Sequence, residues 1–281
     1  CMRIRESQAL ILPPYFFLVI FFILPVIIIL VLSLTHNRDF SAGITFDNYT
    51  RIFDPLYLQV LIRSIIYAAL ATIFALLIGF PLAYFISFAN ARWKMMFMFL
   101  VLVPFWTNFL VRIFAWLTIL GREGLINSFL LWTGIIQEPL HLLHTPGAVI
   151  VGLIYGSLPF MVLPIIAALD RMDSALLEAA TDLGASRFQT FKRIALPLSM
   201  PGVIAGSIFV FIPALGSFVV PDILGGSDSF MVGNTIKNQF MTVRDWSFGS
   251  ALSMVLMLAV LLGVSAYLKK GNDNLNMGEY L

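Results

Sequence analysis

Residues 174–197 read SALLEAATDLGASRFQTFKRIALP, and this stretch decides how the rest of the chain is interpreted. It is polar, charged and helix-prone, whereas long apolar runs lie on both sides of it. Asp173 or Ser174 can cap a helix start, because a side-chain oxygen there can accept a hydrogen bond from an unpaired backbone N–H. Residues 175–183 are rich in Ala, Leu and Glu, which favour helix. The stretch is therefore predicted to begin with a short helix.

The second half of the stretch predicts a turn and another helix. Gly184 stands where helices commonly end in a left-handed residue. Ser186 can cap the second helix. The basic residues of that helix are Arg187, Lys192 and Arg193. Pro197 should end the unit, since proline has no N–H to donate and clashes with a continuing helix. We predict a helix–turn–helix finger over residues 173–197, between two membrane spans.

The composition indicates an integral membrane protein. The chain has 281 residues, of which 60% are hydrophobic and 11% are charged, whereas a soluble domain carries about 25% charged residues. The net charge of +2 is too small to suggest binding to nucleic acid. Because Cys1 is the one cysteine, an internal disulfide is excluded. No small-residue cleavage site follows the first apolar run, so we expect no cleavable signal.

Six apolar runs are long enough to cross a bilayer, which takes about 20 residues per helix. They lie at about 10–34, 57–88, 95–120, 146–169, 198–220 and 248–268. The fifth run should be broken by Pro201 and Pro213, and the sixth should be closed by Lys269 and Lys270. A further run at 125–136 is too short to span, and we expect it to lie in the interface or to re-enter. The chain is interpreted as an all-α protein.

The distribution of Lys and Arg predicts the orientation, because cytoplasmic loops carry an excess of these residues. Six spans place both termini on one side of the membrane. The basic residues of that side are Arg3, Arg5, Arg92, Lys94, Arg171, Arg187, Lys192, Arg193, Lys269 and Lys270. Those of the other side are Arg38, Arg51, Arg122, Lys237 and Arg244, mostly beside acids. We therefore predict one transmembrane domain, 1–281, with both termini and the finger in the cytoplasm.

The finger resembles the EAA loop of the membrane subunits of ABC importers. The matching residues are Glu178, Ala179, Ala180, Gly184, Ile194, Leu196 and Pro197. The resemblance implies a type I importer permease (MetI-like) fold with six transmembrane helices in a bacterial inner membrane, whose finger docks in a groove of a partner ATPase. The residues it assigns to ATPase coupling are Glu178, Ala179, Ala180, Asp182, Gly184, Arg187 and Pro197. An ordinary amphipathic cytoplasmic loop is the alternative.

No pattern in the sequence favours catalysis. The chain lacks the phosphate loop G-x-x-x-x-G-K-S/T and the G-x-S-x-G elbow of serine hydrolases. His36, His141 and His144 have no metal-ligand companion at H-E-x-x-H spacing. We expect no catalytic residue, metal or cofactor in this chain. The resemblance implies that a partner ATPase binds ATP and Mg.

Three clusters suggest a path for a solute, because polar groups and helix breaks in a membrane tend to face the protein interior or water. They are 104–108 with Arg112, 155–160, and 213–218 running on to 221–222. Aromatic faces attract cations, and Asp222 could attract a cationic solute. The residues that we predict along the path are Trp106, Asn108, Tyr155, Phe160, Phe218 and Asp222. Helix packing, or an interfacial role for Trp106, is the alternative.

Other stretches resemble the polyamine (spermidine/putrescine) importer permeases. They are 47–49, 54–57, 104–108, 158–161, 221–222, 224–226, 244–246 and 248–249. The resemblance implies alternating access in a complex of a second, homologous permease, an ATPase homodimer and a periplasmic binding protein. Permeases for sulfate, molybdate, iron or phosphonates share the EAA loop, and Arg112 would suit an anion. Further alternatives are a non-transporting anchor for an ATPase and a membrane enzyme, although the spans lack paired acids.

Overall fold

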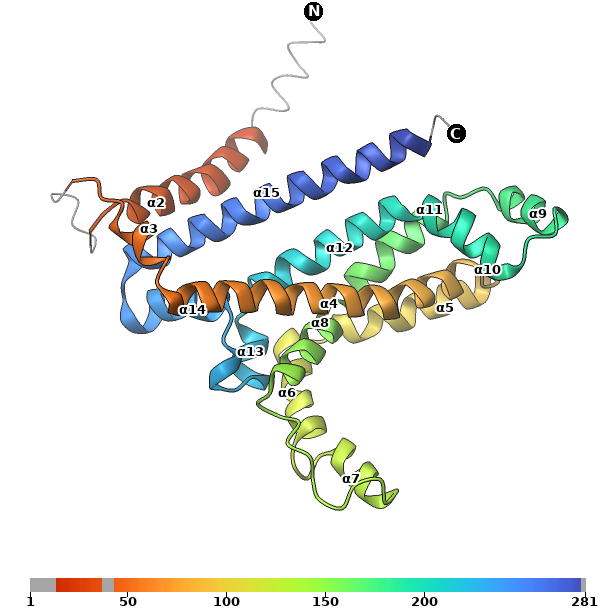
Figure 1. Cartoon of the computed structure of the whole chain (residues 1–281), viewed down its shortest axis with the longest axis horizontal. Coiled ribbons are helices and arrows are strands. Elements are labelled where there is room, and N and C mark those ends of the chain that lie inside the picture. Colours follow the sequence, from red (N-terminus) through yellow and green to blue (C-terminus); the bar gives the residue numbers. More distant parts are fainter. Residues whose placement is uncertain (1–13, 37–42, 279–281) are drawn as a thin grey trace, which may run out of the picture. The chain divides into compact units, whose positions relative to one another are not determined.

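The computed structural model describes residues 14–36 and 43–278, and their regular structure is helical (Figure 1). Four helices in this part are long and apolar enough to cross a membrane, or up to six if each of two bent helix pairs is one span. The chain groups into two compact units. Residues up to Gln59 with Thr235–Leu262 form the first unit, and Val60–Asn234 with the residues from Gly263 form the second. The single-domain interpretation stays a prediction.

The first unit begins with a helix over Pro14–Ser33. One π-helical turn, η1 (Val19–Ile23), precedes α2 (Leu24–Ser33), and Pro25 stands in the first turn of α2, where a missing N–H is tolerated. Residues 10–13 of the first predicted span lie outside the described residues. The remaining elements that lie in this unit, wholly or in part, are α3 (Asp47–Arg51), α4 (Pro55–Ser87), α14 (Val232–Asn238), η6 (Gln239–Val243) and α15 (Trp246–Gly278).

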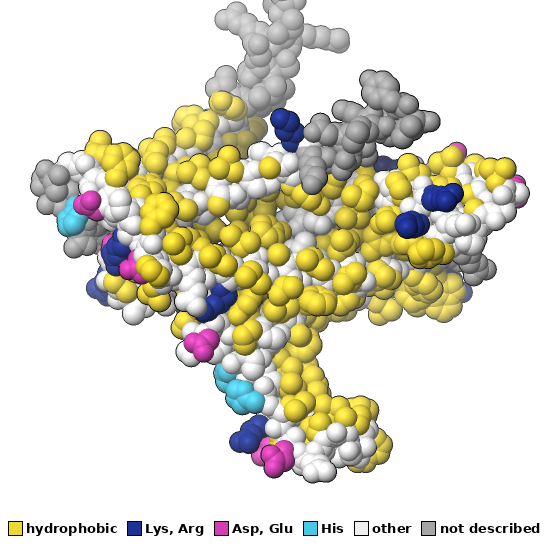
Figure 2. All heavy atoms as spheres, viewed as in Figure 1, with side chains coloured by type: hydrophobic (Ala, Val, Ile, Leu, Met, Phe, Trp, Pro, Cys, Tyr) yellow, Lys and Arg dark blue, Asp and Glu magenta, His cyan; other side chains and the backbone are white. Residues whose placement is uncertain are grey.

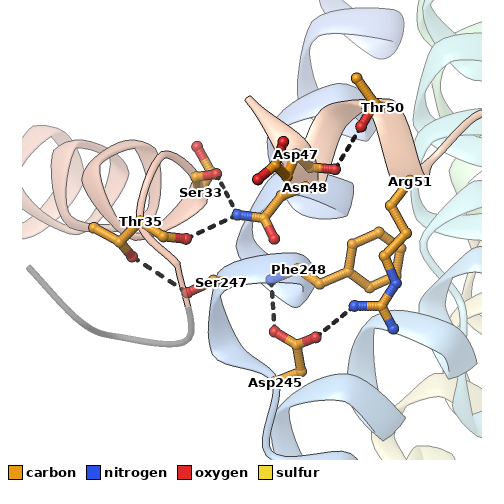
Figure 3. A network of polar contacts seen from close by, with 9 residues as sticks. All are labelled: Ser33, Thr35, Asp47, Asn48, Thr50, Arg51, Asp245, Ser247 and Phe248. Atoms are coloured by element: carbon orange, nitrogen blue, oxygen red, sulfur yellow. Dashed lines mark hydrogen bonds and ion pairs between the residues drawn. The ribbon is translucent and has the colours of Figure 1, made fainter. Parts of the chain in front are cut away.

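A buried amide connects α3 to the end of α2 in the first unit (Figure 3). The Nδ2 atom of Asn48 donates hydrogen bonds to the carbonyl oxygens of Ser33, at 3.0 Å, and Thr35, at 2.9 Å. The hydroxyl oxygen of Thr35 lies 3.2 Å from that of Ser247, at the start of α15. Because these groups are buried, losing one partner would leave an unsatisfied polar group, and the network therefore fixes the three segments together.

An ion pair joins α3 to α15 beside this network (Figure 3). Arg51 Nη1 lies 2.7 Å from Asp245 Oδ2, and the guanidinium carbon lies 4.2 Å from the centre of the Phe248 ring. Asp245 Oδ1 accepts a hydrogen bond from the N–H of Phe248 at 3.0 Å and so caps α15. Burial lowers the pKa of Arg51, but the hydrogen bond to Asp245 and nearby groups raise it above its ordinary value overall.

The core of the second unit lies where α8 (Pro146–Leu169) packs on α12 (Met200–Leu215) and α4. A Cβ added to Gly202 would lie 2.5 Å from the carbonyl oxygen of Pro164, and one on Gly206 would lie 3.0 Å from that of Met161. Glycines four residues apart thus allow α12 to approach α8 closely, as small residues do in membrane helix pairs. The fourth predicted span coincides with α8.

The third predicted span, 95–120, does not form one continuous helix. α5 (Ala91–Leu102) and η3 (Val103–Trp106) are followed by α6 (Phe109–Leu120), and the chain bends by 92° between them. Thr107 is extended, and Asn108 Oδ1 accepts a hydrogen bond from the N–H of Leu110 at 2.8 Å, which starts a new helix. The short run after this span forms α7 (Leu125–Trp132).

One expected helix break is also wrong, because Pro213 does not break α12, which runs to Leu215. The apolar part of α15 that could cross a membrane is Trp246–Tyr267, close to the sixth predicted span, and the helix itself continues past Lys269 and Lys270. Pro201 lies in the first turn of α12, where proline is compatible with helix. The last residues of the fifth predicted span belong to a separate helix, α13 (Val219–Leu224), followed by η5 (Ser227–Ser229).

Candidate functional site

A helix–turn–helix finger connects α8 to α12 in the second unit (Figure 1). It consists of α9 (Ser174–Asp182), α10 (Arg187–Thr190), η4 (Phe191–Ala195) and α11 (Leu196–Leu198). The side chain of Asp173 accepts a hydrogen bond from the N–H of Ala175 at 3.0 Å, so the predicted cap of the first helix is confirmed.

The turn of the finger is built from local hydrogen bonds. Gly184 has φ +79°, and its N–H donates to the carbonyl of Thr181 at 2.9 Å. The N–H of Ala185 donates to the carbonyl of Ala180 at 3.0 Å, which completes a Schellman motif. Ser186 and Gln189 then cap the second helix reciprocally, with side chain to N–H distances of 2.9 and 3.3 Å. The predicted turn and second cap are confirmed.

Pro197 does not end the finger, in contrast to the prediction. The helix runs from Phe188 through Pro197 to Leu198, and the bend of 64° before α12 falls at Ser199. The wider π-helical turn η4 precedes the proline, and Leu196 N–H donates back to Phe191 O. We attribute the continuity to this wider turn, which changes the bonding pattern where proline would break a regular α-helix.

The tip of the finger presents apolar side chains that were not predicted. Glu178, Ala179 and Asp182 are exposed, whereas Ala180 is 8% exposed and packs inward. Leu183 and Phe188, on either side of the Gly184 turn, are 89% and 71% exposed. The signal in the sequence was an apolar residue on each side of a polar turn. The side chain of Arg187 lies outside the described residues.

The returning arm of the finger is anchored in the core of the second unit. The ring centre of Phe191 lies 5.5 Å from those of Phe80 and Tyr84 on α4, edge to face in both cases. Leu196 packs against the same core. A displacement of the tip would therefore reach α4, α8 and α12 through packed side chains, because packed interiors transmit strain.

A cavity of about 450 Å³ lies at the base of the finger, between α8, α9 and α12. Its lining residues are Pro164, Ala167, Ala168, Arg171, Met172, Asp173, Leu176, Leu198, Pro201, Gly202 and Ala205. Asp170, which precedes the lining residue Arg171, forms an ion pair with Lys94. Its Oδ1 atom lies 2.6 Å from Lys94 Nζ, and the pair ties the start of α5 to the end of α8. The base of the finger therefore borders a cavity and follows the end of α8 that the ion pair holds to α5.

An aromatic seam joins the broken third span to α8. We define it by Phe105, Phe109 and Trp116 on one side and Tyr155, Gly156 and Phe160 on the other. Phe105 and Phe160 have ring centres 6.3 Å apart, and Trp116 and Tyr155 have ring centres 5.5 Å apart. A Cβ on Gly156 would lie 3.1 Å from the Phe109 ring. Two predicted path residues, Tyr155 and Phe160, thus lie in one seam.

Arg112 lies beside this seam with its charge against aromatic faces. Its guanidinium carbon is 4.0 Å from the centre of the Phe105 ring and 5.8 Å from that of Phe109. The Nε and Nη1 atoms are shielded from solvent and have no hydrogen-bond acceptor among the described residues. Phe109 and Trp116 were not predicted, although their spacing from Arg112 by three and four residues puts all three on one face of a helix.

The other predicted path residues are divided between two places. Trp106 is 77% exposed and packs edge-on against Phe99, with ring centres 5.7 Å apart, and Asn108 caps α6. Phe218 and Asp222 lie at α13, where the buried Nδ2 atom of Asn234 donates to the Phe218 carbonyl at 2.9 Å and to the Asp222 carboxylate. The helix α13 packs against α6 and α8, the helices that carry most of the seam. Asn234 carried no local sequence signal.

The histidines considered in the sequence do not belong to a cluster of metal ligands among the described residues. His144 has φ +59°, and its Nδ1 atom lies 3.2 Å from the carbonyl oxygen of Gly225. Across residues 14–36 and 43–278, no three His, Cys, Asp or Glu side chains gather as metal ligands would.

Comparison with known proteins adds a family and a set of relatives. The family described as "Binding-protein-dependent transport system inner membrane component" matches residues 75–271. The chain is 47% identical over 223 residues to the spermidine/putrescine transport system permease protein PotB of Escherichia coli (strain K12), covering 79% of this chain and 81% of that protein.

Solved structures of similar fold include a bacterial ABC transporter involved in the import of the acidic polysaccharide alginate. It superposes with a TM-score of 0.81 at 19% identity, covering 97% of this chain and 96% of the other. A second structure, the bacterial alginate ABC transporter in complex with an alginate pentasaccharide-bound periplasmic protein, gives a TM-score of 0.79. At this identity the likeness concerns the fold.

Proposed function

Because this chain belongs to the family of binding-protein-dependent transport system inner membrane components, we propose that it is a permease subunit of an ATP-driven importer of polyamines. It would form half of the translocation path for spermidine or putrescine and work by alternating access. The observation that carries this proposal is the 47% identity to a spermidine/putrescine permease along 79% of the chain. The other half of the path would come from a second, homologous permease.

The finger is the part of this chain that we assign to ATPase coupling. Its exposed residues Glu178 and Ala179 and its apolar tip, Leu183 and Phe188, would dock in the groove of an ATPase homodimer, which binds ATP and Mg and hydrolyses the nucleotide. Phe191 would pass the movement to the core. This chain would be no enzyme itself, and ATP would act through the difference in its affinity for the two states.

Docking of a periplasmic binding protein is assigned to residues 35–55 and 221–247. Part of the first segment, 37–42, lies outside the described residues. The Asn48 network and the pair of Arg51 with Asp245 support this role, because they hold the described parts of both segments in the first unit in fixed positions (Figure 3). A rigid docking surface loses less entropy when a partner binds.

The seam supports a cationic solute by its chemistry. A polyamine carries ammonium groups on an apolar chain, and both parts are attracted to aromatic faces. A permease for an anion such as sulfate, molybdate or phosphonate is the second candidate, because Arg112 places a positive charge beside the seam. The two candidates differ in which labelled solute enters the cell.

The test is uptake of labelled spermidine by cells that hold the partner subunits with or without this chain. We expect uptake only with the chain, and unlabelled putrescine should compete whereas sulfate and molybdate should not. Competition by the anions alone would favour the second candidate. Absence of any uptake beside a correctly inserted complex would contradict the transport role.

A pair of phenylalanines in the finger separates docking from transmission. Phe188→Ala removes an exposed tip side chain and should reduce co-purification of the ATPase. Phe191→Ala removes the anchor on Phe80 and Tyr84 and should leave co-purification intact while spermidine uptake falls. Equal behaviour of the two variants would contradict the assignment. Glu178→Lys should act like Phe188→Ala, with the protein still inserted.

A further inference from the structure

We propose that the aromatic seam is a site for an ammonium group of the solute, and that the guanidinium of Arg112 fills it in the conformation seen here. Arg112 would thus be a tethered competitor, which leaves the rings when a polyamine arrives. The inference rests on the proposed function and adds to it a named subsite and the residue that controls access to it.

The first support is the position of the charge. A positive charge in a membrane span is costly, so it faces the protein interior or water and seeks a partner. Within the described part of the chain, its guanidinium carbon lies over two rings, Phe105 at 4.0 Å and Phe109 at 5.8 Å. These rings can bind any cation that fits between them, because the attraction comes from the ring faces.

The second support is that the seated guanidinium is incompletely satisfied. Its Nε and Nη1 atoms are shielded from solvent, yet no acceptor among the described residues reaches them. Two buried donors without acceptors cost more than one cation–ring contact returns. By leaving the rings for a hydrated path, Arg112 would regain hydrogen bonds to water. A competing cation can therefore take its place on the rings.

The third support is that the seam is open on one side. In this chain Phe160 is 51% exposed and Phe109 is 38% exposed, and Phe105 is less exposed and meets Phe160 edge to face. An ammonium group could reach the rings from that side. A guanidinium and an ammonium group repel each other at such short range, so both cannot occupy the same rings. Binding of solute and seating of Arg112 are therefore mutually exclusive.

The experiment measures spermidine binding to the purified complex of both permeases and the ATPase, without the binding protein. Equilibrium dialysis with labelled spermidine is suitable, because it reports on the permease alone. Arg112→Gln removes the competitor and should bind spermidine roughly 3- to 10-fold more tightly than the wild type, the equivalent of one cation–ring contact. Arg112→Met should show the same gain, and Arg112→Lys, which keeps a cation, should stay near the wild-type affinity.

A ring variant identifies the seam as the place of competition. Phe105→Leu should weaken spermidine binding, and Arg112→Gln should give no gain in the Phe105→Leu background. Unchanged or weaker binding in Arg112→Gln and Arg112→Met would overturn the inference. Loss of the second permease from both variants would overturn it as well, because Arg112 would then pair with an acid of that subunit. A wild-type complex that takes up no spermidine would instead refute the proposed function.

Discussion

Gly184 shows how a single backbone angle shapes the finger. Its φ of +79° lies in the left-handed region, where a residue with a Cβ is less stable by roughly 1–2 kcal/mol. Asn is tolerated there better than other residues. We therefore expect spermidine-stimulated ATP hydrolysis by the complex to fall in the order Gly, Asn, Ala, Val at position 184. Among the described side chains none limits the space, since none of their atoms lies within 4 Å of an added Cβ.

The rank order of the variants in ATP hydrolysis is the informative result, because it separates backbone strain at position 184 from the loss of side-chain contacts. Ala185→Gly is the matched control, since the neighbouring residue does not have a positive φ. It should leave coupling near the wild-type level. An Asn variant as impaired as the Val variant would contradict the role of the left-handed turn.

Asn234 is the residue on which the α13 region depends. Its side chain is 1% exposed, accepts from the N–H of Met231 at 2.9 Å and donates to Phe218 and Asp222. Asn234→Ala would leave buried groups short of a partner, and we expect a loss of stability of about 1–3 kcal/mol. The midpoint of thermal unfolding in detergent should fall, whereas Asn238→Ala, at an exposed position of α14, should leave it unchanged. Equal midpoints for both variants would contradict this account.

Residue-scale predictions succeeded where the relevant partner is close in sequence. The cap at Asp173 and the turn at Gly184 depend on groups within about five residues, so propensity and spacing suffice. The surroundings of Arg112 and Asn234 depend on residues brought together by packing. A single sequence carries little information on such contacts, which explains why Asn234 was missed.

At the scale of elements, the contact of α8 with α12 depends on a small side chain. A Cβ on Gly202 would lie 2.5 Å from a backbone oxygen, which cannot rotate away, whereas one on Gly263 of α15 would meet nothing within 4 Å. Gly202→Ala should therefore destabilise the protein by about 1–3 kcal/mol through overpacking. Gly263→Ala should be neutral or stabilising, because Ala favours helix.

The two glycine variants form a matched pair, since both change a glycine in a long apolar helix to alanine. Thermal unfolding of the detergent-purified protein and the yield of inserted protein are the measurements. If Gly202→Ala were as stable as Gly263→Ala, the close approach of α12 to α8 would be refuted.

The helices themselves show why proline alone is a poor guide to helix ends. Pro81, Pro159 and Pro213 all lie inside long helices, because neighbouring segments compensate for a missing N–H in a membrane protein. The chain breaks instead at Thr107, where the next residue, Asn108, caps a new helix. The sequence showed a Thr107–Asn108 pair, and Asn is a common helix cap, but the continuous apolar run around the pair masked this signal.

At the scale of the whole molecule, the apolar runs predicted the all-α class, because length and hydropathy identify membrane helices directly. The resemblance of the finger predicted the family, which the comparisons confirm. Neither source predicts which helices contact each other, so the aromatic seam could not be foreseen. The predicted path residues were chosen by composition, so the sequence could not show that Tyr155 and Phe160 share the seam while Asn108 caps α6.

The orientation of the chain in the membrane is predicted at the scale of the whole molecule, since it follows from how Lys and Arg are distributed over all of its loops. Ten Lys and Arg residues lie on the side of the finger and five on the other, and the richer side should face the cytoplasm. With Cys1 replaced by Ser, a cysteine at the exposed Ala179 should react with a membrane-impermeant maleimide only in opened cells. A cysteine at the exposed Asp228 should react in intact spheroplasts, and it serves as the matched control. Labelling of Ala179→Cys from outside would reverse the topology, and the finger could then not meet an ATPase.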